Sequence, residues 1–407
     1  MNFLFAWRYF KAKKSTNAIN IIAWVSVIAV ATGTAALIIL LSVFNGFEGL
    51  VKSMYADFYS ELKVAPASGN TLTITENQLK QVAQIPGVHA WSLVMEEKAL
   101  LQNGEYQSIV YVKGVDSQYK KVVDVSERLT RGKFELGTPD HPATVLGIGV
   151  EHNVAVESDK ALLPLTIYLP RKGVSMNTAD PLQSLSADII ATSGSFMIQQ
   201  DFDNKYIITN LGFIKRMLDM GPDEYGALEI RMDDAGKEAE VKQQLAAIFA
   251  RDAVIQNRFE QNRSLYSIMQ TEKWVIYAIL SLILVVAAFT MIGSLMMLVL
   301  EKRKDIQVLK ALGADNRRIQ QIFLSEGLLL AFIGSLLGAS LAILTCWLQT
   351  RYHLIPLEGD TFVINYYPVK IAGTDIILVL LTVFIVAWLA SWLPARKASL
   401  QPIELRS

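Results

Sequence analysis

The sequence predicts an α+β membrane protein with four transmembrane helices and a large mixed α/β extracytoplasmic domain inserted between helices 1 and 2. Three observations lead to this prediction: four long apolar runs, basic segments on one side of them, and a long polar segment between the first two runs. The 407 residues are 52% hydrophobic and 19% charged, a composition typical of apolar spans joined to an ordinary folded domain. The net charge is zero, so we expect no nucleic-acid partner.

The apolar runs carry no charged residue, and they extend from Ile21 to Phe44, Trp274 to Leu300, Gly327 to Gln349 and Ile376 to Ala395. Each is long enough to cross a hydrocarbon core of about 30 Å at a rise of about 1.5 Å per residue. We therefore predict transmembrane segments at 21–47, 274–300, 326–349 and 376–395. The first run is longer than the apolar core of a secretory signal peptide, and we expect it to remain as an anchor.

Basic residues determine the predicted orientation. They gather in the N-terminal segment 1–20, the loop 301–325 and the tail 396–407, and four spans place these segments on the same side of the membrane. Because short cytoplasmic segments carry an excess of Lys and Arg, we expect both termini in the cytoplasm. Segments 48–273 and 350–375 then lie outside the cytoplasm.

The outer segment 48–273 contains both strand and helix patterns. Alternating β-rich runs predict strands at 108–112, 165–169 and 206–209. Apolar residues at helical spacing predict helices at 76–85, 211–220 and 236–250. The length allows one large domain or two lobes, and we favour two interleaved lobes. The aperiodic stretch from Pro170 to Pro181 predicts a protruding loop, which is either a binding loop or a solvated connection.

Several chemistries find no support in the sequence. Cys346 stands alone inside an apolar run, so no intramolecular disulfide can form, and the four histidines are scattered, so we expect no metal site. The chain has no phosphate-binding G-x-x-x-x-G-K-[ST] loop. We therefore expect no catalytic residues and no cofactor bound by this chain.

The loop 301–325 contains a short amphipathic pattern. Ile306, Leu309 and Leu312 recur at intervals of three residues, and Gly313 supplies a helix stop. This pattern predicts a short helix along the inner face of the membrane. From spacing alone, a connecting loop that only sets the topology is the alternative.

This loop resembles the coupling-helix segment of FtsX-like ABC permeases, which have a Lys or Arg, then Asp/Glu-Ile, then Leu, and an Ala-Leu-Gly-Ala-like turn. In that family the segment sits in a groove of a cytoplasmic ATPase subunit and transmits ATP-driven closure. The resemblance implies this role for six residues: Asp305, Ile306, Leu309, Leu312, Gly313 and Ala314.

A narrower resemblance begins at the first span, where Ser42-Val43-Phe44-Asn45-Gly46-Phe47-Glu48 is similar to lipoprotein-releasing permeases of the LolC/LolE type. Further matches are Lys113-Gly114-Val115-Asp116 and the second span, where Thr290 stands in place of the family's usual Asn. The resemblance implies a bacterial inner-membrane permease that works with a second permease copy or paralogue and a cytoplasmic ABC ATPase holding ATP-Mg. Such a permease extracts acylated lipoproteins and passes them to a periplasmic chaperone.

The resemblance also implies two binding regions. Lipoprotein-binding candidates lie near the outer ends of spans one and two: Val43, Phe44, Phe47, Tyr277 and Leu280. For each of them, contact with lipid or packing between helices is the alternative. Chaperone-binding candidates lie in the protruding loop: Pro170, Arg171, Met176 and Pro181. Small residues in span one and the Gly334-Ser335-Leu336-Leu337-Gly338 stretch predict close helix packing, not cargo contact.

Two other functions remain open. A permease of the same topology could act as a mechanotransmitter or export a different amphiphile, and a membrane-anchored enzyme or receptor would need a catalytic constellation that the sequence does not offer. The sequence leaves four points open: the LolC or LolE role, the pairing of permeases as homodimer or heterodimer, the cargo range and the chaperone-contact residues.

Overall fold

The computed structural model describes residues 17–160, 164–170, 185–249, 252–357, 364 and 366–402. They form two compact units, one of residues 17–50, 267–357 and 364–402, and the other of residues 51–266. We call the first the helical unit and the second the outer unit. Each is described by itself.

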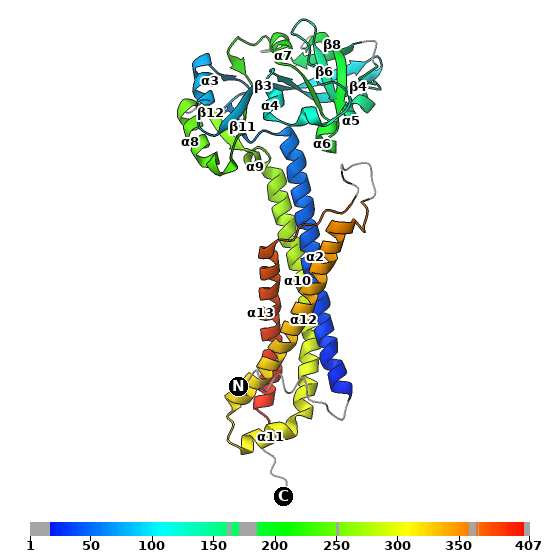
Figure 1. Cartoon of the computed structure of the whole chain (residues 1–407), viewed down its shortest axis with the longest axis vertical. Helices are drawn as coiled ribbons and strands as arrows, with labels where there is room; N and C mark the ends of the chain where they lie inside the picture. The colour runs from blue at the N-terminus through cyan, green and yellow to red at the C-terminus, as the bar shows by residue number, and fades with distance from the viewer. Residues whose placement is uncertain are drawn as a thin grey trace, which may run out of the picture. The chain divides into compact units, whose positions relative to one another are not determined.

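Among the described residues, four helices are long and apolar enough to cross a membrane, and their apolar runs lie in the helical unit (Figure 1). They are α2 (Asn17–Phe58), α10 (Arg263–Glu301), α12 (Asn316–Tyr352) and α13 (Gly373–Ser399). Each contains one of the four predicted apolar runs. The helices extend beyond the runs because a helix ends where backbone hydrogen bonding ends, not where the apolar sequence ends. The described residues of the predicted tail and N-terminal segment are few, and the basic residues before Asn17 lie outside the described part of the chain.

Glycines let α12 approach α2 closely. A Cβ atom added at Gly334 would lie 2.9 Å from the carbonyl oxygen of Val27, and one at Gly338 would collide with the carbonyl oxygen of Ala31. Small residues at this spacing let two helix backbones approach, and van der Waals packing then holds them together. The prediction that the Gly334–Gly338 stretch packs helices is confirmed.

The strands of the outer unit have bounds that follow the β-rich sequence: β1 (Leu62–Pro66), β2 (Leu72–Thr73), β3 (Val88–Asn103), β4 (Tyr106–Val115), β5 (Leu129–Gly132), β6 (Ala143–Gly147), β7 (Leu165–Pro170), β8 (Leu185–Phe196), β9 (Tyr206–Asn210), β10 (Glu224–Tyr225), β11 (Ala227–Met232) and β12 (Ala253–Asn257). Its helices are α3 (Glu76–Ala83), α4 (Tyr119–Val122), α5 (Ile148–Asn153), α6 (Gln200–Asp203), α7 (Leu211–Met217), α8 (Glu238–Phe249) and α9 (Arg258–Gln261). The three predicted strands correspond to β4, β7 and β9, and the three predicted helices to α3, α7 and α8.

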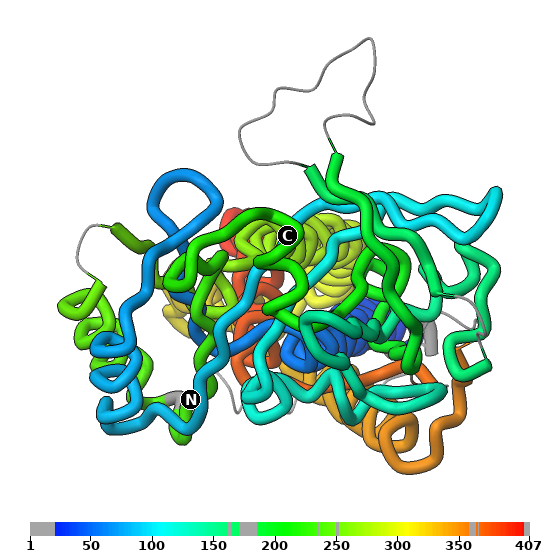
Figure 2. Tube along the Cα trace, turned by 90° about the horizontal axis from the view of Figure 1, so that it is seen from above, coloured from blue at the N-terminus to red at the C-terminus, as the bar shows by residue number. Residues whose placement is uncertain are grey.

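Most strands belong to one 10-stranded sheet with the order β12-β1-β11-β3-β4-β9-β6-β8-β5, and β7 pairs with both β3 and β8. The pairings from β3 through β4, β9, β6, β8 and β7 therefore return to β3 and close a ring. The β3–β4 hairpin, paired from Val94↔Val115 to Asn103↔Tyr106, is the cyan arm at the edge of Figure 2.

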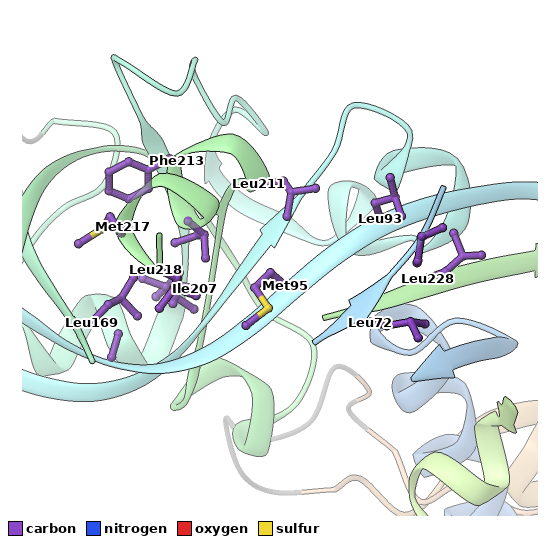
Figure 3. Packing of buried hydrophobic residues seen from close by; sticks show 14 of the residues in the cluster. Leu72, Leu93, Met95, Leu169, Ile207, Leu211, Phe213, Met217, Leu218 and Leu228 are labelled. Atoms are coloured by element: carbon purple, nitrogen blue, oxygen red, sulfur yellow. The ribbon is translucent and has the colours of Figure 1, made fainter. Parts of the chain in front are cut away.

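The long strand β3 makes this unit one body instead of the two lobes that we favoured. Its first half pairs with β11, and its second half pairs with β4 and β7. Figure 3 shows Met95 of β3 between a group that includes Ile207 and Leu169 and a second group that includes Leu72 and Leu228. One strand crossing both halves merges their apolar surfaces into a single core.

A charged pair is buried in this core. Lys113 on β4 and Glu229 on β11 lie 2.8 Å apart, and each side chain is 1% exposed. Burial acts to lower the pKa of Lys113. Electrostatic interactions with Glu229, Tyr119 and Glu96 outweigh the effect of burial, so the pKa is raised. The Lys113 ammonium also lies 5.0 Å from the ring centre of Phe58, the last residue of α2. The Lys113 ammonium is therefore kept charged, and it lies by the rings of Phe58 and Tyr119.

Candidate functional site

The helix α11 (Arg303–Ala311) forms the connection between α10 and α12. Leu312 caps it, and Gly313 follows with φ of 90°, a left-handed conformation that glycine adopts without steric cost. Asp305 lies in its first turn and Lys310 in its last, where each charge complements the helix dipole. A short amphipathic helix therefore occupies the segment where the sequence predicted one.

The apolar residues of α11 face two directions. Ile306 is 1% exposed and packs with Ile319 and Phe323, whereas Leu312 is 80% exposed and Val308 is 58% exposed. Each step of three residues rotates a helix position by about 60°, so Ile306 and Leu312 lie about 120° apart around the axis. The predicted single stripe is therefore divided between a buried face and an outward face.

The remaining coupling candidates lie between these faces. Asp305 accepts a hydrogen bond from Lys302 at 3.1 Å, and Leu309 is half-buried beside a small cavity that Lys302 and Glu326 also line. Gly313 is exposed, and Ala314 packs against the cluster that contains Ile306. The outward face thus consists mainly of Val308, Leu312 and Gly313.

Lys310 connects α11 to the end of α13. Its ammonium donates to the carbonyl oxygens of Ser399 at 2.8 Å and Gln401 at 2.7 Å. The last carbonyl groups of a helix lack intrahelical donors and carry partial negative charge, which a lysine satisfies. Lys310 therefore joins α11 directly to the end of α13. This contact could not be predicted from the sequence, where Lys310 is one of several basic residues that indicate topology.

The opposite end of the helical unit, where the segment between α12 and α13 lies, is called the loop end here. Three polar side chains meet at this end: Asn45 of α2, Lys273 of α10 and Asp375 of α13. The Asn45 amide donates to Asp375 Oδ2 at 2.7 Å, and the Lys273 ammonium donates to Asn45 Oδ1 at 2.9 Å. Lys273 and Asp375 form an ion pair at 3.0 Å, in which Asp375 is 12% exposed. We call these three residues the loop-end triad.

The segment before α13 crosses α2 at Gly46. A Cβ atom at Gly46 would collide with the carbonyl oxygen of Pro368, and the amide of Lys370 donates to the carbonyl oxygen of Ser42 at 2.9 Å. The ring of Phe47 meets that of Tyr367 edge-on, with centroids 5.8 Å apart. The Asn45-Gly46-Phe47 sequence is thus a docking site for this segment.

The predicted cargo residues are only partly brought together. Tyr277 lines a cavity of about 200 Å³ with Leu41, Gln270, Lys273, Trp274, Asp375 and Leu378. Tyr277 also forms a hydrogen bond with Thr382 of α13. Leu280 is buried in the helix core, Val43 and Phe44 are half-buried, and Phe47 contacts Tyr367. Sequence reasoning missed Lys273 and Asp375, which stand at the ends of apolar runs and therefore look like span boundaries.

Of the chaperone-binding candidates, the structure describes Pro170 alone. It ends β7 and lines a cavity of about 390 Å³ with Met95, Leu218 and Met220 among others. Arg171, Met176 and Pro181 lie outside the described residues. Among the described residues, no group of three or more His, Cys, Asp or Glu side chains could hold a metal ion.

Comparisons with known proteins agree with this two-part architecture. Residues 23–248 match the MacB-like periplasmic core domain family, and residues 277–403 match the FtsX-like permease C-terminal family. The chain is 29% identical to the lipoprotein-releasing system transmembrane protein LolC of Neisseria meningitidis serogroup B, over 98% of each chain. It is 28% identical to LolE of Haemophilus influenzae, over 100% of this chain and 99% of the relative. It is 23% identical to LolC of Xylella fastidiosa strain 9a5c, over 98% of this chain and 96% of the relative.

Proposed function

This chain belongs to the family of permeases with a MacB-like periplasmic core domain, and we propose on this basis that it is the permease subunit of an ABC transporter that extracts acylated lipoproteins from the inner membrane. The observation that carries the proposal is the similarity along nearly the whole chain to relatives named LolC and LolE. It covers the helical unit and the outer unit alike. A likeness confined to the helices would fit other FtsX-like permeases equally well.

Extraction needs an external source of energy. Each methylene of an acyl chain transferred out of the membrane costs about 0.8 kcal/mol, so several chains together hold a lipoprotein with tens of kcal/mol. This chain is the non-catalytic subunit in the proposal, and a separate cytoplasmic ATPase binds ATP-Mg. The outward face of α11, with Val308 and Leu312, is the surface offered to a groove of that ATPase. Burial of two exposed aliphatic side chains favours such docking.

The orientation follows from this assignment. The α11 end and both termini lie in the cytoplasm, and the loop end and the outer unit lie on the periplasmic side. A periplasmic chaperone receives the cargo, and the connection after Pro170 is the candidate for its contact. A second permease, either another copy or a paralogue, completes the transporter.

The test is release of a radiolabelled triacylated lipoprotein from proteoliposomes that contain this chain with its copurifying ATPase. We expect release to require ATP and a soluble periplasmic chaperone together. ATPase activity without any release would instead favour a mechanotransmitter or an exporter of another amphiphile.

Leu312→Asp is the matched variant for the coupling contact. Because Leu312 is 80% exposed, the substitution leaves the helical unit intact, and we expect it to lower ATP-dependent release at least tenfold. Arg317→Asp, at an exposed position of α12 nearby, serves as the control. Normal release by the Leu312 variant would refute the docking role of α11.

A further inference from the structure

The loop-end triad connects three helices unequally. α13 is held to α2 by the hydrogen bond from Asn45 to Asp375 and by the docking of residues 366–370 across Gly46. α10 reaches the same place through the Lys273 ammonium, which contacts both Asn45 and Asp375. α2 and α13 therefore share an interlocked backbone contact, whereas α10 is attached by a side chain.

The described residues between α12 and α13 are bonded to both α12 and α2. The Gln349 side chain of α12 donates to the carbonyl oxygens of Ile355 at 3.1 Å and Tyr367 at 3.2 Å, and its carbonyl oxygen accepts from the Ile355 amide at 2.9 Å. Gln349 is 5% exposed. A buried amide with these bonds made holds Ile355 and Tyr367 beside the end of α12. Residues 366–370 are therefore joined to α12 through Tyr367 and to α2 through Lys370.

The unequal attachment of the three helices matters because together they enclose a cavity beside the loop-end triad. Its walls come from α2, α10 and α13, and Lys273 and Asp375 form part of its lining. Its volume of about 200 Å³ is below the roughly 300–1,000 Å³ of pockets that enclose a drug-sized ligand. An occupant as large as several acyl chains requires the walls to separate, and α10 is the wall attached by side chains.

We propose that Lys273 is a positioning residue that holds the loop end of α10 against the α2–α13 pair, and that its release from Asn45 and Asp375 lets α10 move and the cavity widen. The proposal rests on the proposed function only in taking this chain as a helix bundle that a partner ATPase moves. Tyr277, which lies about one turn deeper in α10 than Lys273 and bonds to Thr382, is a further attachment of α10 and the point about which the stretch around Lys273 moves.

The expected effect follows from the strength of the contact. A hydrogen bond to a charged group contributes about 1.5–3 kcal/mol, so loss of the ammonium shifts the ratio of closed to widened states roughly tenfold to hundredfold. Lys273→Met removes the charge and keeps the length of the side chain. Lys273→Arg keeps the charge, and we expect it to restore the closed state.

The experiment measures distances between spin labels in the assembled transporter in lipid nanodiscs, without nucleotide or cargo. Cys346, which is buried, is first replaced by serine, and labels are placed at exposed positions Leu40 of α2, Thr271 of α10 and Ile377 of α13. Thr271 lies on the loop-end side of Tyr277, so in Lys273→Met we expect a second, longer Leu40–Thr271 distance and an unchanged Leu40–Ile377 distance. Arg351→Met, which removes an exposed cation at the same end of α12, is the matched control.

A Leu40–Thr271 distance distribution that is identical in Lys273→Met and in Arg351→Met would overturn the proposal, as would an equal change in both label pairs. Lys273→Gln, which removes the charge and leaves the Asn45–Asp375 hydrogen bond in place, provides the same test if Lys273→Met does not assemble with its ATPase. Because these distances are measured without cargo and without ATP, a negative release assay leaves their interpretation intact. Failure of this inference is thereby separated from failure of the lipoprotein assignment.

Discussion

At the scale of single residues, the outer unit depends on an ion pair that burial makes costly to break. Lys113 and Glu229 are enclosed, and Glu229 Oε2 has no hydrogen-bond partner within the described protein. Removing one member of a buried pair leaves an uncompensated charge, which costs about 3–5 kcal/mol. The pair therefore makes this core sensitive to single substitutions at two positions.

We predict that Lys113→Met lowers the free energy of unfolding of the outer unit by about 3–5 kcal/mol, and that Lys113→Met with Glu229→Met recovers most of the loss. Hydrogen exchange of the β3, β4 and β11 amides in the full chain measures the change. Lys98→Met, at an exposed position of β3, is the control. Equal stability of the single and double variants would contradict the prediction.

A second residue-scale prediction concerns pH. Burial raises the pKa of Asp203 from 3.8 to about 6, against the backbone hydrogen bonds from Ile198 and Gln199 that act to lower it. The folded state therefore binds the proton more tightly than the unfolded state, and the contribution of this carboxyl to stability is lost as pH rises from about 4 to about 6.

Asp203→Asn removes this titration and keeps an oxygen that accepts the Ile198 amide. We predict that the stability of the variant relative to the native chain increases between pH 4 and pH 6 and is constant above pH 7. Hydrogen exchange of the outer unit over this range measures it. A relative stability that is independent of pH would show that Asp203 does not titrate in this window.

At the scale of elements, the close contact of α2 and α12 depends on the absence of side chains. We predict that Gly338→Leu separates the two helices and lowers the thermal midpoint of the chain in detergent by several degrees, because its Cβ meets the Ala31 carbonyl. Gly293→Leu is the matched control, since a Cβ there meets no atom within 4 Å. Comparable losses from both variants would refute a specific role for the α2–α12 contact.

The helices and strands also show which features could be predicted from the sequence. The spans could be predicted because about 20 residues without charge suffice for a membrane helix, whatever their neighbours are. The loop-end triad could not, because its members lie 228, 330 and 102 positions apart in pairs. Charged residues beside an apolar run look alike whether they mark a boundary or form a tertiary contact.

The division of α11 into two faces illustrates the same limit. The spacing of Ile306, Leu309 and Leu312 predicted a helix, but which face meets α12 depends on Ile319 and Phe323, which belong to the next helix. Likewise, the strands β4, β7 and β9 could be predicted from local alternation, whereas the passage of β3 through both halves of the domain could not. The local sequence pattern predicts whether a segment is a helix or a strand, whereas pairing between distant strands determines how they are arranged in the sheet.

At the scale of the whole molecule, the assignment makes a prediction about topology. In a chain with Cys346 replaced, a cysteine at Ile109 of β4 is expected to react with a membrane-impermeant maleimide in intact spheroplasts, and a cysteine at Arg317 of α12 only after permeabilisation. Both positions are exposed, so the difference reports the side of the membrane. Labelling of both cysteines in intact spheroplasts would contradict the proposed orientation.

The docking of residues 366–370 on α2 has a consequence for evolution and for chimeras. Gly46 accommodates the backbone at Pro368, so a substitution in either segment changes the selection on the other, although they are distant in the sequence. The two segments should be inherited together when permease genes recombine. We expect a chimera that takes its first helix from one permease and its last loop from another to lose this contact unless both segments are exchanged together.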